Sequence, residues 1–295
     1  MPRMTRFCIV ALFAVPALLF GPVAHAQVKV FVSIAPQAYL IERIAGPLAQ
    51  VDVLVGPGQN HHTFEPTPKQ MADLAGASLY FTIGLPFEKR LLEKIQSANP
   101  GLKCIDTREG IALRSMETAD EHAEPDPDHG HGAVDPHVWL SPLNAKIIAA
   151  NICRGLKEAD GAHSADYDRN LAALQRELDE CHARISKVLA PLRGGAFYVY
   201  HPAFGYFADA YGLRQIAVEI EGKEPTAKQL AELITRAKAD GVRVIFVQQQ
   251  FPKRAAEAIA KEVGGAVVSI DPLAYDYVRN LEGMADQLWT ALQSK

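Results

Sequence analysis

The 295-residue chain has no excess of basic charge and no apolar run long enough to cross a membrane. Lys and Arg number 30 against 34 for Asp and Glu, so the formal net charge of -4 offers no positive field to hold nucleic acid. The longest apolar run, residues 7–20, is interrupted by Pro16. It is shorter than the roughly 20 residues of a membrane span. The sequence therefore argues against a nucleic-acid-binding protein and a transmembrane protein.

Cysteine is also scarce, and two common enzyme motifs are missing. Of the 4 cysteines, Cys8 lies in the N-terminal apolar run, which leaves Cys104, Cys153 and Cys181. Three thiols cannot build a disulfide framework, and we expect buried free thiols. No GxxxxGK[ST] sequence is present, so any ATP hydrolysis must belong to a partner. HExxH, the helical zinc-protease motif, is absent as well.

The N-terminus has the order of a secretory signal peptide. Arg3 and Arg6 precede the apolar run, which ends in the small-residue sequence Ala-His-Ala at 24–26. The mature chain is predicted to begin at Gln27. Because Cys8 is far from this cleavage site, we expect no lipid anchor. The sequence predicts a soluble protein exported to the periplasm.

From residue 28 onward, short β-branched runs alternate with longer helical patterns. The predicted strands are 28–34, 51–55, 79–83, 196–200, 215–218, 242–247 and 266–270. The predicted helices are 36–46, 68–76, 87–97, 203–211, 226–240, 252–263 and 277–292. This alternation is typical of parallel sheets flanked by helices, and it predicts an α/β fold with two lobes.

One stretch between the two βα regions has a different character. Residues 164–190 contain no Gly or Pro, and apolar residues recur there at near-helical spacing. A helix of this length would be roughly 40 Å long, enough to run along both lobes. We therefore expect an N-terminal lobe over 27–163, a rigid connecting helix over 164–190 and a C-terminal lobe over 191–295.

Residues 115–135 form an acidic segment without Lys or Arg. The segment cannot bury a core, so it is predicted to be a long surface loop. It also contains His122, His129 and His131. These side chains either collect metal weakly or are incidental members of a solvated loop.

Three histidine-containing stretches fall at predicted strand ends or loops. They are NHHTFEPTP at 60–68, DPHVWLSP at 135–142 and YHPAFGYF at 200–207, and Asp271 directly follows the strand 266–270. Open α/β sheets bind ligands at the carboxyl ends of their strands. Three imidazoles and one carboxylate could complete a tetrahedral zinc shell. Each histidine could instead be packed in the core, and Asp271 could cap an Asx turn.

Five ordered motifs resemble a known family. HTFEPTP, DPHVWLSP, YHPAFGYF, IEGKEPTAKQL and IDPLA are similar to motifs of the metal-binding receptors of ABC importers, the ZnuA-like and TroA-like solute-binding proteins of cluster A-I. The resemblance implies two α/β lobes joined by one long helix, with the metal in the cleft between them. It implies the ligands His62, His137, His201 and Asp271. It also implies delivery to a membrane permease, and a periplasmic metallochaperone is a further possible partner.

The motifs depart from the family pattern at the first ligand. The family usually has Pro before that histidine, where this chain has His61, so His61 and His62 both remain candidates. The family's fourth ligand varies among Asp, Glu and water, which makes Asp271 the least secure member. A nitrogen-rich shell favours zinc, while manganese prefers more carboxylate and water. Zinc is therefore the expected cargo and manganese the alternative.

Two other functions compete with a metal receptor. A secreted zinc hydrolase could use the His-Gly-His sequence at 129–131, but that sequence lies in the acidic segment and no general base is evident. A receptor for an organic solute would need an aromatic-rich cleft in place of histidine-rich junctions. We expect a monomeric receptor that is not an enzyme.

Overall fold

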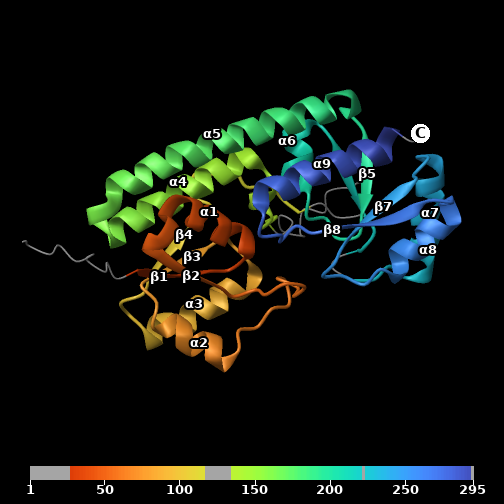
Figure 1. Ribbon diagram of the computed structural model, residues 1–295. Helices are drawn as coiled ribbons and strands as arrows, with labels where there is room; N and C mark the ends of the chain where they lie inside the picture. Colours follow the sequence, from red (N-terminus) through yellow and green to blue (C-terminus); the bar gives the residue numbers. More distant parts are fainter. Residues whose placement is uncertain (1–26, 117–133, 221–222, 294–295) are drawn as a thin grey trace, which may run out of the picture.

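The computed structural model describes residues 27–116, 134–220 and 223–293, arranged as two α/β lobes side by side (Figure 1). Each lobe contains a sheet of four strands, and every strand pair in both sheets is parallel. The predicted α/β fold with two lobes is confirmed. The predicted signal peptide lies outside the described residues.

The N-terminal sheet has the strand order β2-β1-β3-β4. Its strands are β1 (Val28–Val32), β2 (Ala49–Val53), β3 (Leu79–Thr82) and β4 (Lys103–Asp106). Helices α1 (Ala35–Ala45), α2 (Pro68–Ala75) and α3 (Pro86–Ala98) connect them. The continuous apolar sequence of β1 fits its central position, because strands of a parallel sheet are covered on both faces. Val30 in β1 pairs with Val51 and with Leu79.

The C-terminal sheet repeats this arrangement with the order β6-β5-β7-β8. Its strands are β5 (Ala196–Val199), β6 (Arg214–Ala217), β7 (Val244–Gln248) and β8 (Ala266–Ile270). Its helices are α6 (Gly205–Tyr211), α7 (Ala227–Ala239), α8 (Arg254–Val263) and α9 (Tyr277–Gln293). All seven predicted strands are therefore present, with small shifts at their ends.

Two elements were not predicted. The edge strand β4 has the sequence KCID, and its polar ends Lys103 and Asp106 conceal the apolar pattern. Helix α4 (Pro142–Ala159) contains β-branched residues and Gly155, which weaken a helical pattern. Gly155 lies so close to the sheet that a Cβ atom there would come within 2.4 Å of Ile105 and 2.7 Å of Phe81. The glycine is needed for this close approach of helix and sheet.

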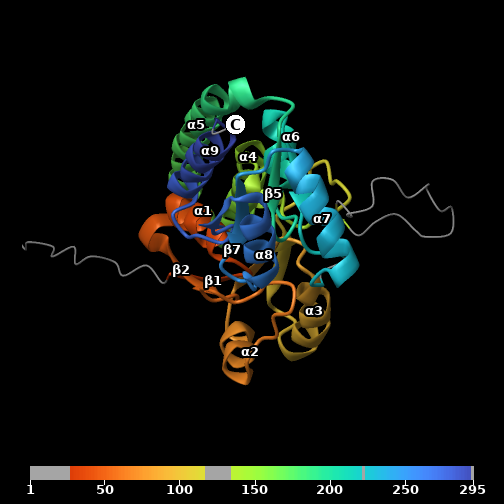
Figure 2. The same cartoon turned by 90° about the vertical axis from the view of Figure 1, so that its right-hand side faces the viewer.

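Helix α5 (Ser164–Leu189) is the predicted connector, and it extends along both lobes (Figure 1). It packs against α1 and α4 of the N-terminal half and against α9 of the C-terminal half, and Figure 2 shows α5 and α9 side by side. Near this junction the Trp139 indole N–H donates to the carbonyl oxygen of Pro272 at 2.8 Å. The Tyr277 hydroxyl donates to the carbonyl oxygen of Trp139 at 2.5 Å. The two halves are thus joined by packing and by hydrogen bonds.

In the part of the chain that the structure describes, the buried apolar side chains form two clusters. The larger cluster runs through the N-terminal lobe, along α5 and into the inner part of the C-terminal lobe, from Val30 through Leu178 to Leu288. The smaller cluster lies within the C-terminal lobe under α7 and α8, and includes Leu233 and Ile259. The main core is therefore continuous between the lobes.

Cys104, Cys153 and Cys181 are free thiols, and the last two are buried, as expected. Cys104 is only half-buried. Within the described residues, no helix is long and apolar enough to span a membrane.

Candidate metal centre

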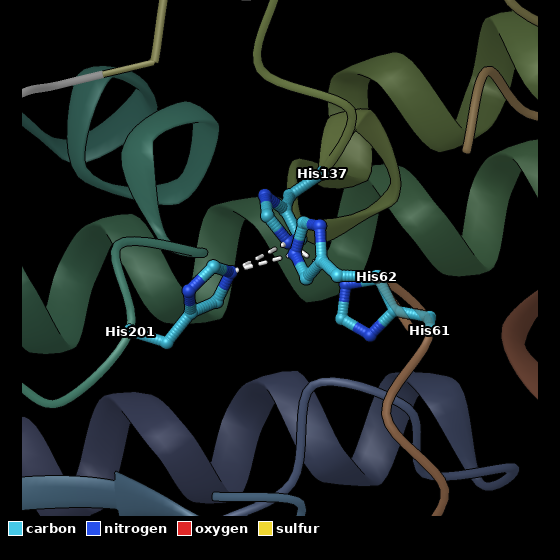
Figure 3. A group of neighbouring side chains, drawn as sticks. All are labelled: His61, His62, His137 and His201. Carbon is cyan, nitrogen blue, oxygen red and sulfur yellow. Dashed lines mark hydrogen bonds between the residues drawn. The ribbon is translucent and has the colours of Figure 1, made fainter. Parts of the chain in front are cut away.

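Four histidines from three separate segments meet between the lobes (Figure 3). His61 and His62 lie in the loop between β2 and α2, His137 precedes α4, and His201 follows β5. Each contributes one ring nitrogen to a group whose members all lie within 4.8 Å of one another. We call these four residues the histidine cluster. Among the described residues, no other group of three or more His, Cys, Asp or Glu side chains has the spacing to hold a metal ion.

The ring nitrogens have the spacing of metal ligands. The Nε2 atoms of His61 and His137 are 3.0 Å apart, and those of His62 and His201 are 2.8 Å apart. The Nε2 atoms of His137 and His201 are 3.3 Å apart. In a tetrahedral zinc site with Zn–N bonds of about 2.0–2.1 Å, the ligand nitrogens are separated by roughly 3.3 Å. The cluster is close to the size that such a shell requires.

A buried carboxylate fixes the ring of His137. The Nδ1–H of His137 donates to Asp135 Oδ1 at 2.7 Å, and its backbone N–H donates to the same oxygen at 3.0 Å. Both side chains are fully buried. A hydrogen bond at Nδ1 sets the tautomer that leaves the Nε2 lone pair free for a metal.

His201 in the other lobe is held in the same way. Its Nδ1–H donates to Glu219 Oε1 at 2.5 Å, and both side chains are 5% exposed. Gln248 at the end of β7 accepts from the backbone N–H of His201 and donates to its carbonyl oxygen. The Phe251 ring stacks on the imidazole with an interplanar angle of 14°. The ring therefore has little freedom to turn.

These two hydrogen bonds leave the Nε2 lone pairs of His137 and His201 available to a cation. A neutral imidazole has one N–H, and His137 and His201 each use it on a carboxylate. Their Nε2 lone pairs therefore face each other, and neither ring can donate to the other. A cation between the two nitrogens would satisfy both lone pairs.

Burial favours the neutral form of His61, His62 and His137. It is the main cause that holds the pKa values of His61 and His137 well below the usual range. Burial, followed by the neighbouring His137 and His201, lowers the pKa of His62 to about 2. Burial also raises the pKa of Asp135 to about 6, against the opposing effects of the His137 backbone N–H and Arg114. Neutral imidazole is the form that binds metal.

The structure brings together His62, His137 and His201 from the expected set, but it does not bring Asp271 to them. The Asp271 carboxylate accepts hydrogen bonds from Gln249 at 2.5 Å, from Gln250 at 2.8 Å and from the backbone N–H of Leu273 at 3.0 Å. The bond from Leu273 is that of an Asx turn, the structural role that the sequence offered as the alternative to metal binding. His61 takes the fourth place in the cluster.

Two supporting residues were missed or misjudged from sequence. Asp135 falls at the end of the acidic segment 115–135, and no motif in the sequence marks Glu219 as a partner of a histidine. Both are buried beneath a ring of the histidine cluster. The Asp-Pro-His spacing could have suggested the first, because a carboxylate two residues before a histidine can reach its Nδ1. His122, His129 and His131 lie outside the described residues.

Fold and site together define a two-lobed α/β binding protein with a cluster of metal-ligating side chains between its lobes. The family model described as ZnuA, zinc-uptake complex component A periplasmic, matches residues 30–291. The chain belongs to this family.

Curated relatives agree with that assignment. The chain is 30% identical over 257 residues to the high-affinity zinc uptake system protein ZnuA of Bacillus subtilis, a match that covers 84% of this chain and 79% of the relative. It is 26% identical to the Yersinia pestis protein of the same description, over 96% of this chain and 97% of the relative. The zinc-binding lipoprotein AdcA of Streptococcus pneumoniae is 27% identical, and the chain spans about half of it, 51%.

Solved structures show the same architecture. A crystal structure of ZnuA superposes with a TM-score of 0.83 at 39% identity, covering 90% of this chain and 99% of that one. The periplasmic zinc-binding protein TroA of Treponema pallidum superposes with a TM-score of 0.77 at 20% identity, over 90% of this chain and 99% of that one, which supports the fold alone. The family consists of periplasmic metal-binding receptors that act with ABC importers, and not of enzymes. The expected class is confirmed, and a secreted hydrolase is excluded.

Proposed function

We propose that this chain captures zinc in the periplasm and delivers it to the membrane permease of an ABC importer. The observation that carries the proposal is the convergence of four imidazole nitrogens within 4.8 Å. His61, His62, His137 and His201 would be the ligands, with Asp135 and Glu219 orienting the rings.

The choice of zinc over manganese rests on the ligand atoms. The four candidate ligand atoms of the histidine cluster are all nitrogen. This donor set suits zinc, whereas manganese prefers carboxylate, carbonyl and water oxygens. The name of the Bacillus subtilis relative points in the same direction. An organic-solute receptor is disfavoured because the side chains that converge between the lobes are histidines with metal-ligand spacing.

The experiment is metal analysis of the mature protein purified without chelator, followed by competition between zinc and manganese. We expect one tightly bound zinc per chain and a weaker affinity for manganese. His137→Ala is the matched variant that should lose this binding. Tighter binding of manganese would refute the assignment of the cargo, and binding of neither ion would refute a metal receptor.

Three further parts of the proposal concern the surroundings of the protein. We propose a monomer without a lipid anchor that serves its permease after cleavage of the signal peptide. A metallochaperone would be an additional partner. His122, His129 and His131 would bind zinc more weakly than the histidine cluster, and deletion of residues 116–132 should leave one tight site.

A further inference from the structure

A polar network runs from His137 through Asp135 and Arg114 to helix α6 of the C-terminal lobe. Arg114 and Asp135 are neighbours because Ser115 and Val134 form an antiparallel bridge, and the backbone N–H of Asp135 donates to the carbonyl oxygen of Arg114 at 2.9 Å. The guanidinium Nη1 of Arg114 lies 3.7 Å from Asp135 Oδ2. Asp135 Oδ1 is the oxygen that holds His137.

The same arginine also contacts helix α6, which follows His201 in the C-terminal lobe. Arg114 Nε lies 3.2 Å from Asp209 Oδ2. The Tyr206 hydroxyl accepts from the backbone N–H of Arg114 and donates to the carbonyl oxygen of Asp135, both at 3.1 Å. One tyrosine on α6 thus binds the residue that precedes the acidic segment and the last residue of that segment.

Gly205, the first residue of α6, makes room for these contacts. A Cβ atom at this position would come within 1.4 Å of Arg114 Nη1 and within 2.8 Å of Asp135 Oδ2. Arg114 occupies the space that a side chain at position 205 would need, so the network requires glycine there. Gly205 lies four residues after His201 in the sequence.

We propose that Arg114 and Tyr206 are positioning residues that hold His137 at its distance from His201 across the two lobes, and so set the affinity and geometry of the metal site. The inference rests on the proposed function, because the quantity being set is metal binding. The mechanism is geometric: Asp135 orients the His137 ring, and the α6 contacts orient Asp135. Hydrogen-bonded partners of metal ligands typically affect affinity by about 10–100-fold when changed.

Tyr206→Phe and Arg114→Met test the network without touching a ligand. Zinc affinity would be measured by competition with a chelating dye, and ligand geometry by the visible spectrum of the Co²⁺-loaded protein. We expect both variants to bind one zinc about tenfold more weakly and to show a changed Co²⁺ spectrum. Arg114→Lys should restore part of the affinity, and Gly205→Ala should resemble Arg114→Met.

Matched controls separate positioning from general destabilisation. Tyr198→Phe removes another buried hydroxyl contact, to Asp240, and Gly283→Ala adds a Cβ atom that meets nothing within 4 Å. Both should retain the affinity and spectrum of the unchanged protein. Unchanged zinc affinity in Tyr206→Phe and Arg114→Met, or a lower melting temperature alone, would refute the inference but not the proposed function. Failure of the unchanged protein to bind zinc would refute both.

Discussion

The two halves of the histidine cluster are held in different ways. His137 and His201 each donate Nδ1–H to a buried carboxylate. His61 and His62 are adjacent in one loop, and the buried Nδ1 of His61 has no hydrogen-bond partner. His137 and His201 are therefore held in place before metal arrives, whereas the positions of His61 and His62 depend on the path of their loop.

Removing a ligand from the fixed half should have the largest effect. We expect His137→Ala or His201→Ala to weaken zinc binding by more than about a hundredfold, beyond the range for residues that only support a ligand. Isothermal titration or dye competition would measure it. His182→Ala is the control, because His182 contacts Tyr211 away from the cluster. Near-normal affinity in His137→Ala would contradict the proposed site.

Changing the carboxylates that hold His137 and His201 should have the second-largest effect on zinc binding. Glu219→Gln and Asp135→Asn should each weaken zinc binding by about 10–100-fold, because an amide is a weaker acceptor for the Nδ1–H and carries no charge. The same titration checks this result. If neither change alters affinity, the two halves of the cluster do not differ in the way the hydrogen bonds indicate.

The loop pair should be more tolerant of change. His61→Ala and His62→Ala should each weaken zinc binding by less than the change at His137, since the neighbouring imidazole remains available to the ion. The sequence left both histidines as candidates for the first ligand, and the place of His61 in the cluster predicts a measurable loss for His61→Ala. Full affinity in His61→Ala, measured by dye competition, would leave a three-histidine site.

The lowered pKa values predict how pH affects the protein without metal. For His61, His62 and His137, the pKa is lower in the folded protein than the 6.5 of an unfolded chain. The unfolded state therefore binds more protons below pH 6.5, so these residues contribute stability above that pH that is lost as pH falls. Asp135, with its pKa raised to about 6, opposes this trend at pH values below 6.

Denaturation of the metal-free protein between pH 7.5 and 5.5 would check this expectation. The free energy of unfolding should fall by about 1 kcal/mol for each of the buried rings at the lower pH. His62→Gln should show a shallower dependence, because one titrating ring is gone. A free energy of unfolding that rises as the pH falls through this range would contradict the assigned shifts.

Asp271 should give the smallest effect. Its carboxylate is already bonded to Gln249, Gln250 and the backbone of Leu273, so Asp271→Asn should leave zinc affinity essentially unchanged. Side-by-side titration with Glu219→Gln compares two carboxylates that follow strands of the same sheet. A comparable loss of zinc affinity in both variants would show that Asp271 takes part in metal binding.

Sequence predicted the fold well where the pattern is local. The β-branched runs and the stretch without Gly or Pro marked the strands and α5, whereas β4 and α4 were missed because polar ends and Gly155 weaken their patterns. The structure brings the motif histidines His62, His137 and His201 together, whereas Asp271 bonds to Gln249 and Gln250 and His61 joins the cluster. Which side chain turns inward depends on long-range contacts, such as those that hold Asp271 to Gln249, and spacing alone does not contain them.

The continuous core has a consequence for how the molecule unfolds. Because the larger apolar cluster passes from one lobe through α5 and α9 into the other, the lobes share one cooperative unit. The cluster under α7 and α8 is separate, so this outer layer can open at a lower free energy than the rest. Amide hydrogen exchange at the rim of the C-terminal lobe should therefore be faster than along α5.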